Sequence, residues 1–356
     1  DYPIDRLDVK IVLEADDAET IDAANEIAWP SHVELIVVPA GRPRTKPKAM
    51  NYALTFARGD FVTVYDAEDA PDPAQLRAAL DAFAAGGEDL GCVQAPLLFD
   101  NGKAGWLASQ FAAEYAIQFG EVLPLLARLK LPLMLGGTSN HFRLAALIGC
   151  GGWDPYNVTE DADIGYRLVR EGWRVGMIAP PTWEEAPANL NAWIKQRTRW
   201  IKGHVQTWLV LMRDPGRTRR ELGWRGFAAM HLILGGGIVA SMAHGPLLAL
   251  LALTAFNAPI ALAPWAWALA IAGYIVTVYN IITAAIATRD WRMGISALTM
   301  PLYWPLATIA ALRALIQLIF RPHYWSKTEH GLTARDTRPV FAVSDPGQST
   351  FSPASA

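Results

Sequence analysis

Short apolar runs alternate with amphipathic stretches along the first two thirds of the chain. The runs rich in β-branched and aromatic residues, which predict strands, are 8–13, 33–38 and 61–65. The stretches with helical spacing of apolar positions are 18–27, 47–57 and 72–85. This alternation is typical of a mostly parallel sheet with helices on its faces. We therefore expect an α/β fold whose ligands bind at the carboxyl ends of the strands.

Three longer helices are predicted further along, at 105–129, 161–171 and 191–212. The first of them is apolar around most of its circumference, which favours packing in a core over a position on a bilayer surface. A further strand is predicted at 138–143, directly after a Gly-Gly turn.

The pattern then changes to long uncharged stretches. No Asp, Glu, Lys or Arg occurs from 226 to 288, although 18% of all residues are charged. Within this stretch, 231–253 and 262–288 are each long enough to cross the roughly 30 Å of hydrocarbon in a bilayer. We therefore predict a folded domain at 1–225, followed by transmembrane or interfacial helices at 226–330.

Arginines around the two spans predict their orientation. Five arginines lie shortly before the first span, two follow the second, and the loop between the spans has neither Lys nor Arg. Because positive residues favour the cytoplasmic side, the folded domain is predicted to face the cytoplasm. A third uncharged stretch, 293–312, contains Pro301 and Pro305 and runs into further cations, which favours a re-entrant or interfacial segment. Residues 331–356 are predicted to form a disordered tail.

The net charge of the chain argues against one class of binding partner. The chain has 31 Lys and Arg against 34 Asp and Glu, which gives a formal net charge of -3. A protein that grips the phosphates of nucleic acid is usually strongly basic, so nucleic acid is excluded as the main partner. The uncharged stretches predict the lipid bilayer instead.

Two acidic motifs follow predicted strands or open a helix. Asp66 and Glu68 come after the strand at 61–65 and can together hold a hard divalent cation such as Mg²⁺ or Mn²⁺. The alternative is an acidic turn that caps a helix. Glu160 and Asp161 follow Thr159 at a helix start, where a carboxylate can take a proton from an attacking hydroxyl. The alternative there is a helix cap without a further role.

Two basic motifs lie near predicted helix faces. Gln196, Arg199 and Trp200 share one face of a helix, where Arg can bind a phosphate bidentately and the indole offers an apolar face to a sugar ring. The alternative is a basic amphipathic helix at the bilayer surface. Lys46, with Lys48, precedes a helix N-terminus, which favours phosphate. The alternative is a pair of solvated lysines.

The motifs Asp66-x-Glu68, Thr159-Glu160-Asp161 and Gln196-x-x-Arg199-Trp200, in this order and followed by membrane helices, carry a resemblance to a known family. They resemble the processive, membrane-embedded family 2 glycosyltransferases, the group of cellulose, chitin and hyaluronan synthases. The resemblance covers about residues 1–330. It implies a GT-A-like fold, with a further strand before Asp1, and a bacterial origin. A segment at 322–328 is similar to the one that follows the last membrane helix in bacterial members.

The resemblance also implies a role for each motif. Asp66 would contact the nucleotide diphosphate and its metal ion, and Glu68 would complete the metal site. Asp161, next to Glu160, would be the general base. The residues on the acceptor and pyrophosphate side would be Gln196, Arg199 and Trp200. The residues beside the nucleotide would be Lys46 and either Glu14 or Asp16.

The expected activity is therefore an inverting, metal-dependent hexosyl transfer from UDP-glucose or UDP-GlcNAc to a growing β-linked polysaccharide. The expected location is the bacterial inner membrane, and subunits of an export complex are expected partners. Two alternatives stay open. One is a non-processive enzyme that moves one sugar to a lipid phosphate, and the other is a non-catalytic scaffold of a polysaccharide secretion complex.

Overall fold

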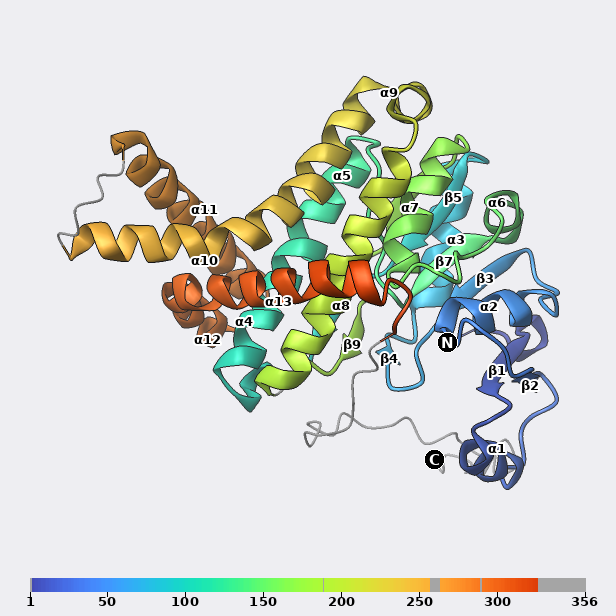
Figure 1. Cartoon of the computed structure of the whole chain (residues 1–356). Coiled ribbons are helices and arrows are strands. Elements are labelled where there is room, and N and C mark those ends of the chain that lie inside the picture. The colour runs from blue at the N-terminus through green and yellow to red at the C-terminus, as the bar shows by residue number, and fades with distance from the viewer. Residues whose placement is uncertain (1, 188, 257–262, 289, 326–356) are drawn as a thin grey trace, which may run out of the picture.

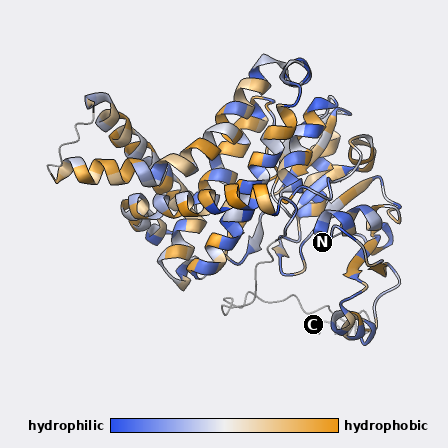
Figure 2. Ribbon diagram, viewed as in Figure 1, coloured by the Kyte–Doolittle hydropathy of each residue, from blue (hydrophilic) through white to orange (hydrophobic). Residues whose placement is uncertain are grey.

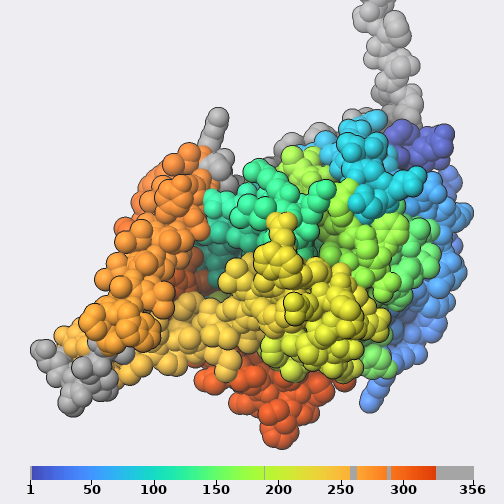
Figure 3. Space-filling model, turned by 90° about the horizontal axis from the view of Figure 1, so that it is seen from above, coloured from blue at the N-terminus to red at the C-terminus, as the bar shows by residue number. Residues whose placement is uncertain are grey.

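The computed structural model describes residues 2–187, 189–256, 263–288 and 290–325, and Figure 1 shows their arrangement. An α/β part, built from the first half of the chain, lies beside a group of long helices from the second half. Seen from above, α10 and α11 project on the side opposite the N-terminal strands (Figure 3). The polar and apolar halves expected from the sequence are therefore separate in space.

The strands form three small sheets. They are β1 (Val9–Glu14), β2 (Val33–Val38), β3 (Phe61–Val64), β4 (Ala70–Pro71), β5 (Leu90–Gln94), β6 (Leu97–Phe99), β7 (Asn140–Arg143), β8 (Arg174–Met177) and β9 (Thr182–Glu184). Their orders are β1-β2, β3-β7-β5-β8 and β4-β9-β6. The three strands predicted from apolar runs are present as β1, β2 and β3.

The expectation of a mostly parallel sheet is wrong in one respect, because the central sheet is mixed. β7 lies between β3 and β5 and is antiparallel to both, whereas β5 and β8 are parallel. The strand predicted at 138–143 is thus the cause of the mixing. Since β7 inserts between β3 and β5, it brings the loop before it, with Thr138, next to the end of β3.

The helices of the α/β part match the predicted stretches closely. They are α1 (Ala18–Asn25), α2 (Lys46–Leu54), α3 (Gln75–Gly86), α4 (Trp106–Ile117), α5 (Leu123–Arg128), α6 (Leu144–Gly149), α7 (Glu160–Arg170) and α8 (Leu190–Leu211). A π-helical segment, η3 (Gln118–Val122), joins α4 to α5. Phe111 of α4 is 1% exposed, so this helix packs in a core as the sequence predicts.

Three helical stretches in the described residues are long and apolar enough to cross a membrane: Pro215–Ala255, Pro264–Ile286 and Trp291–Phe320. They comprise α9 (Pro215–Met230), η4 (His231–Gly235), α10 (Gly236–Ala255), α11 (Pro264–Thr288), α12 (Trp291–Ser296), η5 (Ala297–Thr299) and α13 (Met300–Phe320). Figure 2 shows largely hydrophobic residues along α10, α11 and α13.

The third of these stretches contains two prolines. The segment at 293–312 was expected to be re-entrant or interfacial because it holds Pro301 and Pro305. In the structure, α13 is a continuous helix of 21 residues that contains both prolines. Pro301 stands in its first turn, where the missing N–H needs no partner. Both prolines therefore fit within a helix, and the re-entrant or interfacial placement of 293–312 at a bilayer stays a prediction. The tail predicted at 331–356 lies outside the described residues.

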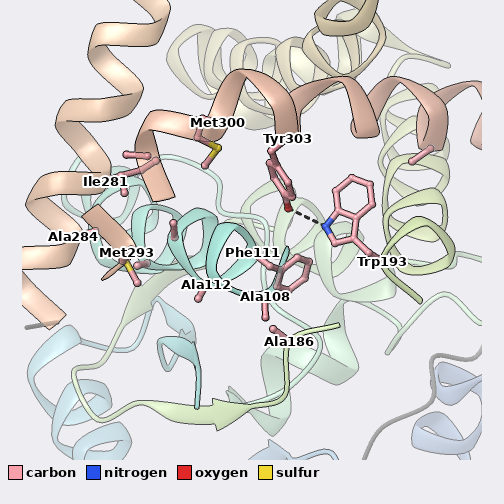
Figure 4. Close-up of a cluster of buried hydrophobic side chains, with 14 of the residues drawn as sticks. Ala108, Phe111, Ala112, Ala186, Trp193, Ile281, Ala284, Met293, Met300 and Tyr303 are labelled. Carbon is pink, nitrogen blue, oxygen red and sulfur yellow. Dashed lines mark hydrogen bonds between the residues drawn. The ribbon is translucent and has the colours of Figure 1, made fainter. Parts of the chain in front are cut away.

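A buried cluster joins the long helices to the α/β part. It contains Phe111 of α4, Trp193 of α8, Ile281 of α11 and Tyr303 of α13, and Figure 4 shows their side chains converging. Buried apolar area is the main favourable contribution to such an interface. The helix α8 is therefore held on one side by membrane-type helices, and it presents its other side to the cavity described next.

Candidate active site

One cavity of about 320 Å³ lies where the loop after β3, the segment at 134–138, the start of α7 and the helices α4 and α8 meet. Eight of the ten residues predicted as site residues line it: Lys46, Asp66, Glu68, Glu160, Asp161, Gln196, Arg199 and Trp200. Four motifs that lie between Lys46 and Trp200 in the sequence therefore share a single cavity.

Asp66 is fixed directly beyond the end of β3. Its backbone N–H donates to Thr138 Oγ1 at 3.2 Å, and its carboxylate forms an ion pair with Lys46. The Lys46 Nζ also donates to the carbonyl oxygen of Gly137 at 2.6 Å. Burial lowers the pKa of Lys46, but the nearby Asp66, Glu160 and Asp161 raise it more, so its net pKa is raised. Lys46 is thus a permanent cation among the acids of the cavity.

Glu160 and Asp161 occupy the first turn of α7. Glu160 is 3% exposed, and burial together with the charge of Asp161 raises its pKa to about 8. Burial also raises the pKa of Asp161, while the N–H of Ala162 and the charges of Arg199 and Lys46 oppose the shift. The side chain of Thr159 caps no N–H of this helix. The Asp161 carboxylate accepts a hydrogen bond from the N–H of Ala162 in this first turn at 2.8 Å. The capping role and the catalytic role of the acidic pair therefore both stay predictions.

A close helix approach places the acidic pair of α7 opposite Arg199 of α8. Gly203 of α8 faces Thr159, and the missing Cβ lets the two backbones come together. Arg199 Nη1 donates to the carbonyl oxygen of Val158 at 3.3 Å. Its guanidinium also lies over the ring of Trp325, 4.9 Å from the ring centroid. The Arg199 charge is consequently held within the electrostatic range of Asp161.

Trp200 forms an aromatic wall of the same cavity. Its ring lies 5.6 Å from that of Phe111 and 5.8 Å from that of Tyr115, measured between centroids. Tyr115 lines the cavity as well. The rings of Trp200 and Tyr115 thus give the cavity an aromatic lining on which a sugar ring can pack.

Glu14 and Asp16, predicted to lie beside the nucleotide, are not among the residues that line the cavity. Glu14 is the last residue of β1, and Asp16 follows two residues later. Glu14 forms an ion pair with Lys48 at 2.9 Å, and Asp16 forms one with Arg44 at 2.7 Å. These ion pairs tie the two carboxylates to Lys48 of α2 and to Arg44 shortly before it. The structure therefore separates them from the eight clustered residues, and their role stays a prediction.

Several cavity residues were not predicted from the sequence. Burial and the charges of Asp66 and Glu68 raise the pKa of Asp69 to about 7, although a hydrogen bond with Thr138 opposes the shift. Burial and the charges of Asp69 and Asp66 raise the pKa of Glu184, and its Oε1 is buried without a partner among the described residues. Glu184 ends a strand of three residues, which leaves no periodic signal.

Asp66 and Glu68 offer carboxylate oxygens, which are the ligands that Mg²⁺ and Mn²⁺ prefer. Among the described residues, no group of three or more His, Cys, Asp or Glu side chains is arranged to hold a metal ion. A cation held by two carboxylates needs further oxygen ligands from water or a bound anion. The donor set therefore fits a metal ion that binds together with a diphosphate.

A comparison with family models gives one match. The family described as "Glycosyltransferase like family 2" matches residues 1–203. This range contains every predicted site residue, including the Gln196, Arg199 and Trp200 face of α8. It ends before the apolar helices begin.

Curated relatives match over about two thirds of the chain. A β-monoglucosyldiacylglycerol synthase of Synechocystis sp. is 28% identical over 243 residues, which are 66% of this chain and 50% of that protein. A probable glucomannan 4-β-mannosyltransferase of Arabidopsis thaliana is 26% identical over 238 residues, which are 65% of this chain and 43% of that protein. The chain thus spans about half the length, or less, of these relatives.

A solved structure is similar in fold. It is the mannosyltransferase PcManGT from Pyrobaculum calidifontis, in complex with GDP-Man and Mn²⁺. The TM-score is 0.53 at 22% sequence identity, and the match covers 85% of this chain and 80% of that one. The GT-A-like fold class predicted from the sequence is confirmed.

Proposed function

Because this chain belongs to the glycosyltransferase like family 2, we propose that it transfers a hexose from a uridine-diphosphate sugar to a growing β-linked polysaccharide, with inversion at the anomeric carbon. The observation that carries the proposal is the convergence of Asp66, Asp161 and Arg199 on one cavity. The family membership makes the chain an enzyme, so the non-catalytic scaffold is set aside. UDP-glucose and UDP-GlcNAc are the proposed donors.

The reaction is a single displacement at the anomeric carbon. Asp161 takes the proton of an acceptor hydroxyl, the hydroxyl oxygen bonds to the anomeric carbon, and the bond to the diphosphate oxygen breaks. Arg199 and Lys46 are the cations that stabilise negative charge on the departing diphosphate. The raised pKa of Asp161 supports this role, because a stronger base accepts the proton more readily.

Asp66 and Glu68 are the proposed ligands of Mg²⁺ or Mn²⁺, which when bound neutralises charge on the diphosphate. The complex of the similar mannosyltransferase with GDP-Man and Mn²⁺ supports a divalent ion. In this chain the family's familiar Asp-x-Asp is Asp-x-Glu, so the second ligand reaches the metal through a longer side chain. Glu14 and Asp16 stay the proposed contacts to the uridine side.

The acceptor is proposed to lie along Gln196 and Trp200. The rings of Trp200 and Tyr115, with the buried Phe111 behind them, support a sugar at this place, because aromatic faces pack against the apolar faces of sugar rings. The packing of α8 against α13 puts this wall next to the apolar helices. We propose a bacterial inner-membrane enzyme with a cytoplasmic active site that couples synthesis to export, with subunits of an export complex as partners.

A second candidate acceptor is a membrane lipid. The relatives named as β-monoglucosyldiacylglycerol synthases favour it, since one of them is 28% identical over 66% of this chain. A diacylglycerol hydroxyl would reach the cavity from the bilayer beside α13. The product would then carry one sugar, as in the alternative transfer to a lipid phosphate.

Transfer by the full chain in nanodiscs tests these proposals. Radiolabelled UDP-glucose, UDP-GlcNAc and GDP-mannose are supplied in turn, with Mn²⁺, and with dioleoylglycerol in one arm. A polymer on a gel supports the polysaccharide proposal, and a labelled lipid on a thin-layer plate supports the second candidate. Polymer that stays only on the outside of inverted vesicles would remove the export step. No transfer from any donor would contradict the proposed function.

A further inference from the structure

A polar network lies within the apolar cluster that joins α13 to the α/β part. Trp193 of α8 donates its indole N–H to the hydroxyl oxygen of Tyr303 of α13, with Nε1 and Oη 2.9 Å apart (Figure 4). Trp193 is 1% exposed and Tyr303 is 2% exposed. The two helices are thus joined by a hydrogen bond that water does not reach.

The Tyr303 hydroxyl is shared by three groups. It donates to Glu114 Oε2 of α4 at 2.7 Å, and it accepts from Trp193 and from Arg197 Nη2, the latter at 3.3 Å. Arg197 also forms an ion pair with Glu114. One donated and two accepted bonds use the full capacity of a hydroxyl. The orientation of Tyr303 is therefore determined by α4 and α8 together.

Arg197 transmits this orientation to the acceptor wall. Its guanidinium lies over the rings of Trp200, Trp193 and Phe111, with centroid distances of 5.1, 5.1 and 5.3 Å. A cation over an aromatic face is attracted to it. Because Arg197 is adjacent to Gln196 and stacks on Trp200, a shift of its guanidinium displaces the wall of the cavity.

Tyr303 itself does not line the cavity, whereas Glu114, Arg197 and Trp200 do. A partly buried charged pair such as Arg197 and Glu114 gives little net stability compared with apolar residues of similar volume, but its hydrogen bonds favour one arrangement of its partners. The network therefore contributes more to fixing the positions of Arg197 and Trp200 than to the folding stability of the protein.

We propose that Tyr303, on a membrane-type helix, is a positioning residue for the acceptor side of the cavity and acts through Glu114 and Arg197 on Trp200. This inference rests on the proposed function, because it assigns the acceptor to the Trp200 wall. The packing of α13 then influences acceptor binding, whereas the donor side of the cavity, with Asp66 and Lys46, is unaffected.

Tyr303→Phe in the full chain tests the proposal, since it removes the hydroxyl and keeps the ring. We expect the KM for the acceptor, cellotetraose or dioleoylglycerol vesicles, to rise about tenfold, as for loss of a hydrogen bond to a charged group. The KM for the nucleotide sugar and its slow hydrolysis without acceptor stay unchanged. Glu114→Gln, which weakens the same network from α4, is also expected to raise the acceptor KM.

Thr299→Val is the matched control. Thr299 accepts hydrogen bonds from Trp106 at 2.7 Å and Gln110 at 2.8 Å, so it ties α4 to the residue just before α13. A loss of stability at this interface would lower the melting temperature of both variants. Only the Tyr303→Phe change is expected to alter the acceptor KM.

A measurement without turnover separates the inference from the proposed function. In protein labelled with 5-fluorotryptophan, the ¹⁹F resonance of Trp200 is assigned by its loss in Trp200→Phe. We expect Tyr303→Phe to shift this resonance and Thr299→Val to leave it in place. An unshifted resonance in Tyr303→Phe, or equal changes in acceptor and donor KM, would overturn the inference. Absence of transfer by the unmodified protein would contradict only the proposed function.

Discussion

Gly203 of α8 approaches Thr159 at the start of α7 so closely that a Cβ on Gly203 would lie 2.2 Å from Thr159 Oγ1. This contact sets the distance between the helix that carries Arg199 and the helix that carries Asp161. The geometry of the cavity therefore depends on a residue that has no side chain and takes no part in the chemistry.

Gly203→Ala is expected to separate α7 from α8. Because the added methyl group meets a buried side chain, we expect a loss of about 1–3 kcal/mol in stability and a marked loss of transfer. Thermal unfolding and initial transfer rates measure the two effects. Gly120→Ala is the control, since a Cβ there would meet nothing within 4 Å. Equal behaviour of the two variants would contradict the close-approach argument.

Asp161→Asn is expected to lower the transfer rate on the order of a hundredfold or more, because the amide cannot accept the acceptor proton. Binding of UDP, measured by calorimetry, stays close to that of the unmodified protein. Glu171→Gln removes one carboxylate from the exposed end of the same helix and is expected to be neutral. Normal turnover of Asp161→Asn would exclude it as the general base.

Glu160→Gln is expected to make the protein more stable at pH 8. The unfolded chain loses the Glu160 proton near its ordinary pKa of 4.5, whereas the folded protein holds it to about 8. The folded state therefore binds more protons in this window, and its stability falls as the pH rises. The melting temperature of Glu160→Gln should exceed that of the parent by a few degrees at pH 8 and match it at pH 4.5. A constant difference at all pH values would contradict this origin.

Removal of the metal ion is expected to abolish tight binding of UDP. Calorimetric titration of the protein with UDP is carried out in Mn²⁺ and again after addition of EDTA. Asp66→Asn and Glu68→Gln should each weaken the metal-dependent binding of UDP at least tenfold. Asp60→Asn, at the opposite end of β3, keeps full binding because it is exposed and far from the cavity. Binding of UDP that is insensitive to EDTA would argue against the metal site.

Most helices and the longer strands were predictable because their apolar residues recur with the period of a helix or a strand. β2 matches the apolar run at 33–38, and α8 matches the helical spacing at 191–212 within one residue at each end. β6 and β9 have three residues each, too few for a period of two to be visible. The antiparallel placement of β7 was not predictable either, since strand order depends on long-range pairing.

The cavity was predictable as far as its residues lie in short motifs. Asp66, Asp161 and Arg199 are each next to other polar residues of the same motif. Glu184 and Glu114 belong to no motif, and only the folding of β9 and α4 against the cavity brings them into it. The network of Tyr303 depends on three helices that are distant in the sequence, so no local pattern contains it.

We propose that one metal-bound nucleotide diphosphate lies between Asp66 and Arg199. A structure of the full chain with UDP and Mn²⁺, determined by cryo-electron microscopy in nanodiscs, measures this directly. We expect density for the metal at Asp66 and Glu68 and for the diphosphate within reach of Arg199. Density for the nucleotide outside this cavity, at well-defined occupancy, would contradict it.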